Sequence, residues 1–298
     1  MDIGRVGIWT GQFDYQPART VAEAAAEVEE LGFSALWTGE AAGREIMAVC
    51  GLLLAATSRL IIASGIANIW ARDAMAMAAG QATLAEAYPE RFLLGIGVSH
   101  APLIEGPRGH VYRQPLAAMR TYLEAMTSGA ARYRAVQASS RPLTVLAALG
   151  PRMLQLSADH ADGAHTYFVP PEHTAQARAI VGPNRLLVPE QAVVLERDPA
   201  RAREIARRHT GAYLRLPNYV RNLQRLGFSE EDTTGGGSDR LVDAIVAWGG
   251  EEEIVGRVRA HQDAGADHVA VQVLDPDPRG LPRAQWRPLA PALLAQQG

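Results

Sequence analysis

The sequence contains no lysine, so all 29 of its basic residues are arginine. This absence excludes Schiff-base aldolases, pyridoxal-phosphate enzymes and P-loop NTPases, because each of these mechanisms requires a lysine side chain. Cysteine is nearly absent as well. The single Cys50 cannot form an internal disulfide, and its place in an apolar, helix-like run predicts a small buried core residue.

A strong net charge and long apolar runs are also missing. The formal net charge of -3 provides no basic surface for a phosphate backbone, so we expect no nucleic-acid partner. No apolar run approaches the length of a membrane span, and the chain does not open with a basic segment followed by an apolar one. We therefore expect a cytoplasmic protein without a membrane partner.

Patterns of metal ligands are sparse. No His-x-His pair follows the first expected strand. The nearest cluster, Asp-His-Ala-Asp-Gly-Ala-His at 159–165, spans the end of a helix and the start of a strand rather than one ligand face. We expect no metal site.

Strand-like and helix-like patterns alternate along all 298 residues, and no linker rich in Pro, Gly and Ser divides the chain. This alternation favours a single α/β domain with a parallel sheet, and eight βα units without a spare strand predict a closed (β/α)8 TIM barrel. The expected strands are 5–9, 34–37, 60–65, 92–96, 143–147, 163–167, 192–195 and 268–273. The expected helices are 20–31, 45–57, 72–88, 114–126, 152–160, 172–181, a long region from Pro199, and 283–294.

The seventh and eighth expected strands are separated by about 70 residues, too many for one crossover helix. We expect an insertion here, at about 209–240, within the single domain 1–298. Its run 229–238 reads Ser-Glu-Glu-Asp-Thr-Thr-Gly-Gly-Gly-Ser and contains almost no apolar side chains. This composition predicts a mobile loop that orders over a bound ligand.

The segment 88–100, Tyr-Pro-Glu-Arg-Phe-Leu-Leu-Gly-Ile-Gly-Val-Ser-His, is the most informative in the chain. Its apolar part is too short for a helix and predicts a buried strand, after which Gly95 and Gly97 leave the backbone bare for a flat or phosphorylated ligand. A dinucleotide fingerprint and a Gly-x-Ser-x-Gly nucleophile elbow both come close to this pattern. Each requires a helix immediately afterwards, and Pro102 argues against one.

The carboxyl ends of the strands in such a barrel converge on one site. They carry Trp9, Glu40, residues 65–68, residues 97–100, residues 147–151 and Tyr167. These residues predict a small, aromatic pocket that is poor in charge and holds one carboxylate and one imidazole. A planar aromatic cofactor suits such a pocket.

Four segments together resemble the bacterial luciferase-like barrel proteins, and most closely their deazaflavin-dependent branch, which uses coenzyme F420. They read Ala-Ser-Gly-Ile-Ala-Asn at 63–68, Thr-Leu-Ala-Glu-Ala-Tyr-Pro-Glu-Arg at 83–91, Leu-Gly-Ile-Gly at 94–97 and Ala-Ala-Leu-Gly-Pro at 147–151. The resemblance covers essentially the whole chain. It implies a TIM barrel of the luciferase-like type and a homodimer.

The resemblance also implies roles for these residues toward the cofactor. The third-strand bulge would back the ring, with a non-proline cis peptide bond between Gly65 and Ile66. The exit of the fourth strand would line the ribityl and phosphate groups, and the loop after the fifth strand would meet the phosphate. The implied cofactor-binding residues are Trp9, Gly65, Ile66, Ala67, Asn68, Gly97, Val98, Ser99, Ala148, Leu149, Gly150, Pro151 and Tyr167.

We therefore interpret the chain as an F420-dependent oxidoreductase that passes a hydride between the deazaflavin and a small substrate. His100 is the candidate acid/base, because an unperturbed imidazole titrates near pH 6.5, at about working pH. Glu40 is the second candidate catalytic residue, either orienting His100 or contacting the ring.

The substrate expectation comes from departures within the family. Its sugar-phosphate dehydrogenases have a His just after the second-strand acid and lysines for the substrate phosphate, whereas this chain reads Glu40-Ala41 and has no lysine. A weakly charged alcohol, ketone or activated alkene is the expected substrate. Two alternatives stay open: an FMN-dependent monooxygenase, and a flavin- or deazaflavin-binding protein without turnover.

Overall fold

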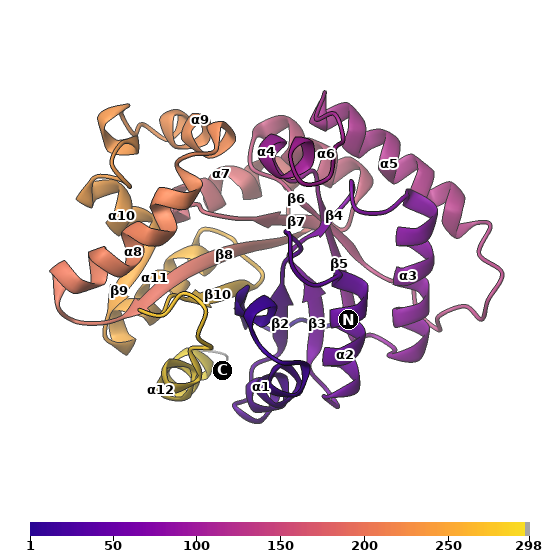
Figure 1. Cartoon of the computed structure of the whole chain (residues 1–298), viewed down its shortest axis with the longest axis horizontal. Coiled ribbons are helices and arrows are strands. Elements are labelled where there is room, and N and C mark those ends of the chain that lie inside the picture. Colours follow the sequence, from indigo (N-terminus) through magenta and orange to yellow (C-terminus); the bar gives the residue numbers. More distant parts are fainter. Residues whose placement is uncertain (296–298) are drawn as a thin grey trace.

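In the computed structural model, which describes residues 1–295, eight parallel strands close into a barrel with helices around it (Figure 1). The strand order is β10-β1-β2-β3-β5-β6-β7-β8, and β8 pairs with β10 to close the ring. The predicted TIM barrel is confirmed. The barrel strands are β1 (Val6–Trp9), β2 (Ala35–Thr38), β3 (Ile61–Ser64), β5 (Phe92–Gly97), β6 (Thr144–Ala147), β7 (Gly163–Thr166), β8 (Leu186–Leu195) and β10 (Val269–Val273).

Two further strands were not expected from the sequence. The two-residue β4 (Ala67–Asn68) continues the chain after the β3 bulge and pairs with β5, and it is too short to show a pattern. The second, β9 (Val246–Gly249), pairs with β8 outside the barrel. Both β9 and β10 pair with Ala192 and Val193, so they lie on opposite edges of β8.

The seventh barrel strand, β8, begins six residues before the expected position 192. Its first part includes Pro189, Glu190 and Gln191, which interrupt the apolar pattern that marks a strand. Both polar side chains are nevertheless buried. Local sequence alone did not indicate that a proline and two polar residues would lie inside a barrel strand.

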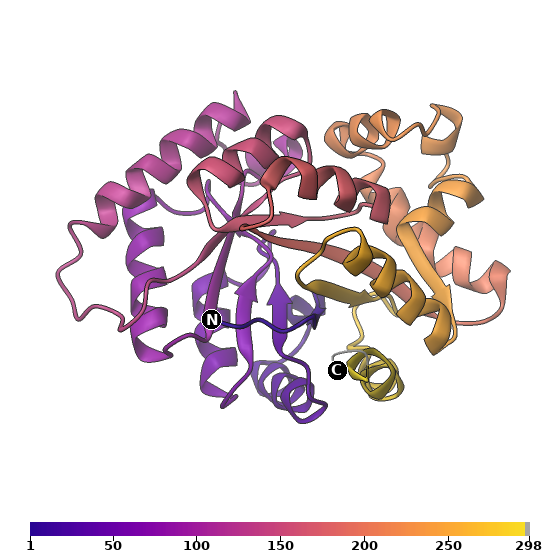
Figure 2. The ribbon, with the colours of Figure 1, turned by 180° about the vertical axis from the view of Figure 1, so that it is seen from behind.

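Seven helices around the barrel, and α8 (Pro199–Tyr213) in the segment after β8, correspond to the regions predicted. The seven are α1 (Ala18–Glu30), α2 (Ile46–Ala55), α3 (Ala74–Ala87), α5 (Pro115–Ala130), α6 (Pro151–His160), α7 (Pro171–Val181) and α12 (Arg283–Leu294). Local signals set several of their starts. Asp73, for example, caps α3 by accepting a hydrogen bond from Ala76 N at 2.8 Å. Figure 2 shows this ring from behind, with the 131–143 connection extending beyond it.

A short helix, α4 (Ala101–Glu105), follows β5, so the expectation of no helix there is wrong. Pro102 lies in the first turn, where a helix makes no use of the backbone N–H that proline lacks. The closed barrel is neither a Rossmann fold nor an α/β-hydrolase fold. The dinucleotide fingerprint and the nucleophile elbow are therefore both excluded as interpretations of the segment 88–100.

Most of the chain between β8 and β10 forms a lobe beside the barrel (Figure 1). The lobe consists of α8, α9 (Pro217–Arg225), α10 (Asp239–Ile245) and β9. The helix that follows, α11 (Glu251–Asp263), was not predicted and packs against α7 and α12 as part of the ring around the barrel.

The composition of the 229–238 run predicted a mobile loop with few contacts. In the structure, the run does make contacts. Asp232 accepts hydrogen bonds from Ser229 N at 2.9 Å and Ser238 Oγ at 2.6 Å, and it pairs with Arg240 at 2.7 Å.

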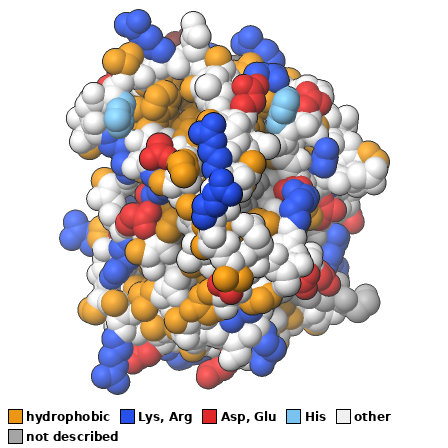
Figure 3. Space-filling model, turned by 90° about the vertical axis from the view of Figure 1, so that its right-hand side faces the viewer, with side chains coloured by type: hydrophobic (Ala, Val, Ile, Leu, Met, Phe, Trp, Pro, Cys, Tyr) orange, Lys and Arg blue, Asp and Glu red, His pale blue; other side chains and the backbone are white. Residues whose placement is uncertain are grey.

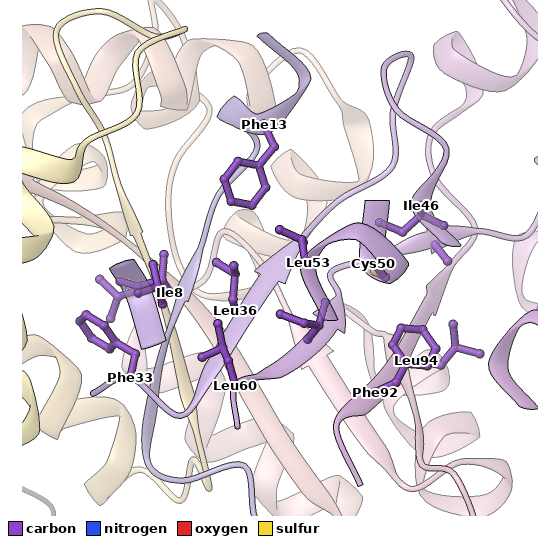
Figure 4. Packing of buried hydrophobic residues seen from close by; sticks show 14 of the residues in the cluster. Ile8, Phe13, Phe33, Leu36, Ile46, Cys50, Leu53, Leu60, Phe92 and Leu94 are labelled. Carbon is purple, nitrogen blue, oxygen red and sulfur yellow. The ribbon is translucent and has the colours of Figure 1, made fainter. Parts of the chain in front are cut away.

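Apolar side chains fill the space between the barrel and its helices. Figure 4 shows Ile8 of β1, Leu36 of β2 and Leu94 of β5 in one cluster with Leu53 of α2. Inside the barrel, Trp37 is fully buried and its Nε1–H donates to His268 Nε2 at 3.2 Å. His268 Nδ1 lies 2.9 Å from the Gly4 carbonyl oxygen, consistent with a structural histidine at the amino end of the barrel.

The surface view agrees with the low net charge. On the face seen in Figure 3, acidic and basic side chains are interspersed and neither sign covers a large area. Among residues 1–295, no helix is long and apolar enough to cross a membrane. The same residues contain no group of three or more His, Cys, Asp or Glu side chains arranged to hold a metal ion.

Candidate active site

A cavity of about 740 Å³ opens at the carboxyl ends of the barrel strands. The barrel contributes one part of its wall, and α8 and α9 of the lobe contribute another, through Ile205, His209, Tyr213, Leu216, Asn218 and Tyr219. Most of the predicted site residues line it: Trp9, Glu40, Gly65, Ile66, Val98, Ser99, His100, Ala148, Leu149, Gly150 and Tyr167. No residue of 229–238 does.

Four of the predicted residues lie outside the cavity wall: Ala67, Asn68, Gly97 and Pro151. Ala67 and Asn68 are buried in β4, where the Asn68 side chain accepts a hydrogen bond from Trp70 N at 3.0 Å. Pro151 is exposed at the first turn of α6. The structure therefore places these residues behind or beside the cavity rather than on its surface.

The β3 bulge forms one wall of the cavity. Its peptide bond between Gly65 and Ile66 is cis, which confirms the prediction. Gly65 N donates to Thr38 O at 2.7 Å, and Trp9 Nε1 donates to Gly65 O at 3.1 Å. A β-carbon at position 65 would lie 2.6 Å from Trp9 Nε1, so only glycine fits against the indole.

Glu40 lines the cavity, but its carboxylate is already occupied. One oxygen, Oε2, accepts from Arg72 Nη1 at 3.0 Å and from Asn68 N at 2.8 Å, and the other also pairs with Arg72. Its side chain is only 4% exposed. Within residues 1–295, no hydrogen bond joins Glu40 to His100. The carboxylate thus fixes the backbone that follows the bulge.

His100 lies where the barrel meets the lobe. It precedes α4 at the cap position, and its ring is tilted against Tyr219 of α9 with 5.5 Å between centroids. Burial lowers the pKa of His100 below its ordinary value, and a hydrogen bond with the Asn218 side chain opposes this shift. The imidazole is therefore mainly neutral at neutral pH.

The two residues before His100 hold the cavity wall through their backbone. Ser99 has a positive φ of 56°, and its carbonyl oxygen accepts from Tyr112 Oη at 3.1 Å. The Val98 carbonyl oxygen accepts from Trp70 Nε1 at 3.0 Å. Neither Tyr112 nor Trp70 was predicted to support the site, because each lies in a loop, 13 and 28 residues from its partner, and not at a strand end.

Two cavity residues that sequence reasoning missed, Tyr213 and Gln272, form a hydrogen-bonded chain with the predicted Tyr167. Tyr213 Oη donates to Tyr167 Oη at 2.9 Å, and Tyr167 Oη donates to Gln272 Oε1 at 2.7 Å. Burial raises the pKa of Tyr213 to about 12 and raises that of Tyr167 well above its ordinary value, so both phenols stay protonated. They present neutral polar groups in an otherwise aromatic wall.

A buried carboxyl group lies beneath this wall without reaching the cavity. Glu190 of β8 is 1% exposed, and its Oε2 accepts from Phe168 N at 3.2 Å. Burial raises the pKa of Glu190 to about 8, so it is largely protonated at neutral pH. Phe168 has a positive φ of 60°, and Glu190 therefore holds the tight turn that carries Tyr167 into the cavity.

The sequence profile described as luciferase-like monooxygenase matches residues 4–268. The chain belongs to this family. In addition, a Mycobacterium tuberculosis protein provisionally described as a coenzyme F420-dependent oxidoreductase is 27% identical over 195 residues. That match covers 56% of each chain, so this luciferase-like protein spans about half the length of that relative in the match.

Solved structures share the fold over nearly the whole chain. An F420-dependent secondary alcohol dehydrogenase, in complex with an F420-acetone adduct, superposes with a TM-score of 0.77 at 14% identity, covering 97% of this chain and 99% of the other. The oxygenating constituent of 3,6-diketocamphane monooxygenase from Pseudomonas putida, in complex with FMN, gives 0.71 at 12% identity, with 99% and 98% covered. At these identities, both matches establish the luciferase-like fold alone.

The residues of this luciferase-like chain fit a flat tricyclic cofactor. The bulge presents bare backbone at Gly65, and the buried His165 Nε2 in the cavity wall has no protein partner within residues 1–295. At the loop before α6, a β-carbon on Gly150 would lie 3.3 Å from Arg225 Nη2, so a guanidinium lies beside a helix amino terminus. Such a pair favours a phosphate group.

Proposed function

We propose that this protein is an F420-dependent oxidoreductase acting on a small, weakly charged organic substrate. The observation that carries the proposal is the Gly65–Ile66 bulge, which forms a bare wall at one side of a charge-poor aromatic cavity at the barrel mouth. The deazaflavin is preferred over FMN because of the curated relative and the four sequence segments that resemble the deazaflavin-dependent branch.

Different residues would hold the ring, the ribityl chain and the phosphate of the cofactor. Gly65, Ile66 and Trp9 would contact the ring, and Val98 to His100 would line the ribityl chain. The loop Ala148–Pro151, the amino end of α6 and Arg225 would hold the phosphate. When bound, the deazaflavin supplies hydride chemistry that no side chain can perform.

The protein's own contribution would be a proton and an orientation. The neutral imidazole of His100 would take the proton from an alcohol during oxidation and return it in the reverse direction. Both phenolic protons of the chain from Tyr213 to Gln272 are already donated, so Tyr213 Oη would position an alcohol substrate by accepting a hydrogen bond from its hydroxyl group. Glu40 would act through the bulge that it anchors.

The composition of the wall bears on the class of substrate. Arg208 is the cationic side chain among the lining residues, and it donates to Pro276 O at 2.6 Å and to Glu204 at 2.9 Å. A phosphorylated or carboxylated substrate would therefore find no unengaged cation there, whereas an alcohol, ketone or activated alkene fits the tyrosine-rich wall.

Titration of the purified protein with F420 and with FMN, each oxidised and reduced, tests the proposal. We expect F420 to bind with micromolar affinity or better and more tightly than FMN in both redox states. Binding of FMN alone would favour a monooxygenase instead. Tight binding of F420 with no hydride transfer across a panel of alcohols, ketones and enones would favour a carrier protein.

From the resemblance, we also propose that the protein is a homodimer. Within each subunit, we propose that residues 1–298 form a single domain that includes the insertion at about 209–240. Light scattering coupled to size-exclusion chromatography should give twice the mass of 32.0 kDa. A monomeric mass at micromolar concentration would contradict the assembly without affecting the cofactor proposal.

A further inference from the structure

His165 is a buried histidine in the wall of the cavity near the carboxyl end of β7. It is 2% exposed, and its ring stacks on Trp37 with 4.9 Å between centroids and 21° between planes. Packing against the barrel interior therefore fixes the orientation of the imidazole. Proton transfer by His100 makes no use of this side chain.

The hydrogen bonding of His165 defines which nitrogen carries the proton. Nδ1 lies 2.8 Å from the carbonyl oxygen of Val188, and a carbonyl can only accept, so Nδ1 is the donor. Burial lowers the pKa of His165 to about 4, and the ring stays neutral at neutral pH. Nε2 is consequently a bare acceptor, and it has no partner within residues 1–295.

This acceptor lies at the foot of the bulge. A β-carbon at Gly65 would be 3.2 Å from His165 Nε2, and both residues line the cavity. The neighbouring indole N–H of Trp9 does not satisfy it, because it donates to Gly65 O. A buried acceptor without a partner is unfavourable and calls for a donor from outside the protein.

We propose that His165 Nε2 accepts a hydrogen bond from the imide N–H of the cofactor's pyrimidinedione ring and so identifies that edge of the ring. The inference rests on the proposed function, in that the cavity binds a ring of this class. It does not depend on the choice between F420 and FMN, because both carry an imide N–H between two carbonyl groups. Gln272 supports it: its Oε1 accepts from Tyr167, which leaves its amide N–H groups for a ring carbonyl.

Methylation of the imide nitrogen provides the test. Binding of the deazaflavin riboside and of its N3-methyl derivative would be followed by fluorescence, in parallel with riboflavin and N3-methylriboflavin. In whichever pair binds to the wild-type protein, we expect the N3-methyl derivative to have at least about tenfold lower affinity than its parent, because a buried hydrogen bond is lost.

The variants decide whether His165 causes this discrimination. In His165→Ala, and in His165→Phe as a second variant that keeps a ring against Trp37, the two ligands should bind within about twofold of one another. His268→Gln is the matched control, because His268 also packs on Trp37 but lies outside the cavity. It should retain the wild-type discrimination. A second readout is the ¹⁵N chemical shift of His165 Nε2, which should move toward the hydrogen-bonded range when the parent ligand binds.

The outcomes separate this inference from the proposed function. If the riboflavin pair shows the effect and neither the deazaflavin pair nor F420 itself binds, the F420 proposal is wrong and the role of His165 stands. If the deazaflavin binds but wild-type protein does not discriminate, or if His165→Ala and His165→Phe still discriminate, the role of His165 is overturned while the F420 proposal stands. If neither ring binds, with or without its phosphate, both are wrong.

Discussion

The backbone of Gly97 lies directly behind the side chain of Ile66. A β-carbon at position 97 would be 2.7 Å from both Cγ1 and Cδ1 of Ile66, and 3.0 Å from the β-carbon of Ala147. Gly97 therefore does not contact the cavity itself. It leaves the space into which the bulge side chain packs, and so sets how far the bulge projects into the cavity.

Gly97→Ala should displace Ile66 toward the cavity. We expect the unfolding free energy to fall by about 1–3 kcal/mol from overpacking and F420 affinity to fall by about tenfold or more. Chemical denaturation and fluorescence titration measure the two effects. Gly256→Ala in α11 is the control, because a β-carbon at position 256 would have nothing within 4 Å, and it should be neutral or stabilising. Unchanged cofactor affinity in Gly97→Ala would show that the bulge does not contact the ring.

His100→Ala should lower turnover by about 10² to 10⁴ while changing F420 affinity only a few fold. In the direction of substrate oxidation the neutral imidazole is the active form. Because its pKa is lowered, the wild-type rate should stay level at neutral pH and decline only as the pH falls well below about 6.5. The rate profile of the variant should lack this acidic limb. A variant as active as the wild type would make His100 a structural contact of Asn218 and Tyr219.

Glu40→Ala should be mainly a stability variant. Loss of a 4%-exposed carboxylate that pairs with Arg72 and the Asn68 backbone should cost about 3 kcal/mol of unfolding free energy. Glu40→Gln should cost less, because the amide oxygen can still accept from Asn68 N. The surface pair Arg19–Glu23 gives a control, where Glu23→Ala should cost no more than about 0.5 kcal/mol. Full stability of Glu40→Gln with turnover abolished would instead indicate a catalytic carboxylate.

Glu190 should make stability depend on pH in an unusual direction. Its pKa is raised to about 8 in the folded protein from an ordinary value near 4.5, so the folded state binds the proton more tightly. This contribution to stability is fully present below pH 4.5 and is lost as the pH rises through about 8. The difference in unfolding free energy between wild type and Glu190→Gln, measured by denaturation across this range, isolates it from the buried histidines. A difference that is constant with pH would mean that the carboxyl group is ionised throughout.

The sequence was sufficient for the barrel because alternation of short apolar runs with amphipathic helices is a local property. The cis bulge was predicted from the resemblance to the family rather than from a local pattern, and the close approach of Trp9 explains why position 65 is glycine. Gly97 was expected to leave the backbone bare for a ligand, but it instead leaves space for the side chain of Ile66. The sequence did not indicate the tyrosines of α8 and α9. Their contribution depends on how the lobe folds over the barrel mouth, and no local period encodes that.

A second kind of omission concerns His165. The sequence pattern placed it within a strand, where histidine is usually a packed and satisfied core residue. Only the geometry shows that one ring nitrogen is used by Val188 and the other has no protein partner within residues 1–295. Conversely, Ala67, Asn68 and Pro151 follow the implied motif but lie outside the cavity wall, because a motif specifies chain position and not exposure.

Arg225 should provide the cation for the cofactor phosphate in a chain without lysine. Its Nη2 would be 3.3 Å from a β-carbon on Gly150, at the amino end of α6, and it donates to Asn222 Oδ1 at 2.9 Å, so its orientation is fixed within α9. Arg225→Gln should weaken F420 binding by about tenfold at low salt and reduce its salt dependence, because a charge-assisted contact is lost. The deazaflavin riboside, which lacks the phosphate, should bind the variant and the wild type equally.

Arg221→Gln, at an exposed arginine on the same helix, is the control and should leave the affinities for F420 and for the riboside unchanged. Equal losses for F420 and the riboside would show that Arg225 acts by supporting the fold of α9 rather than by binding phosphate.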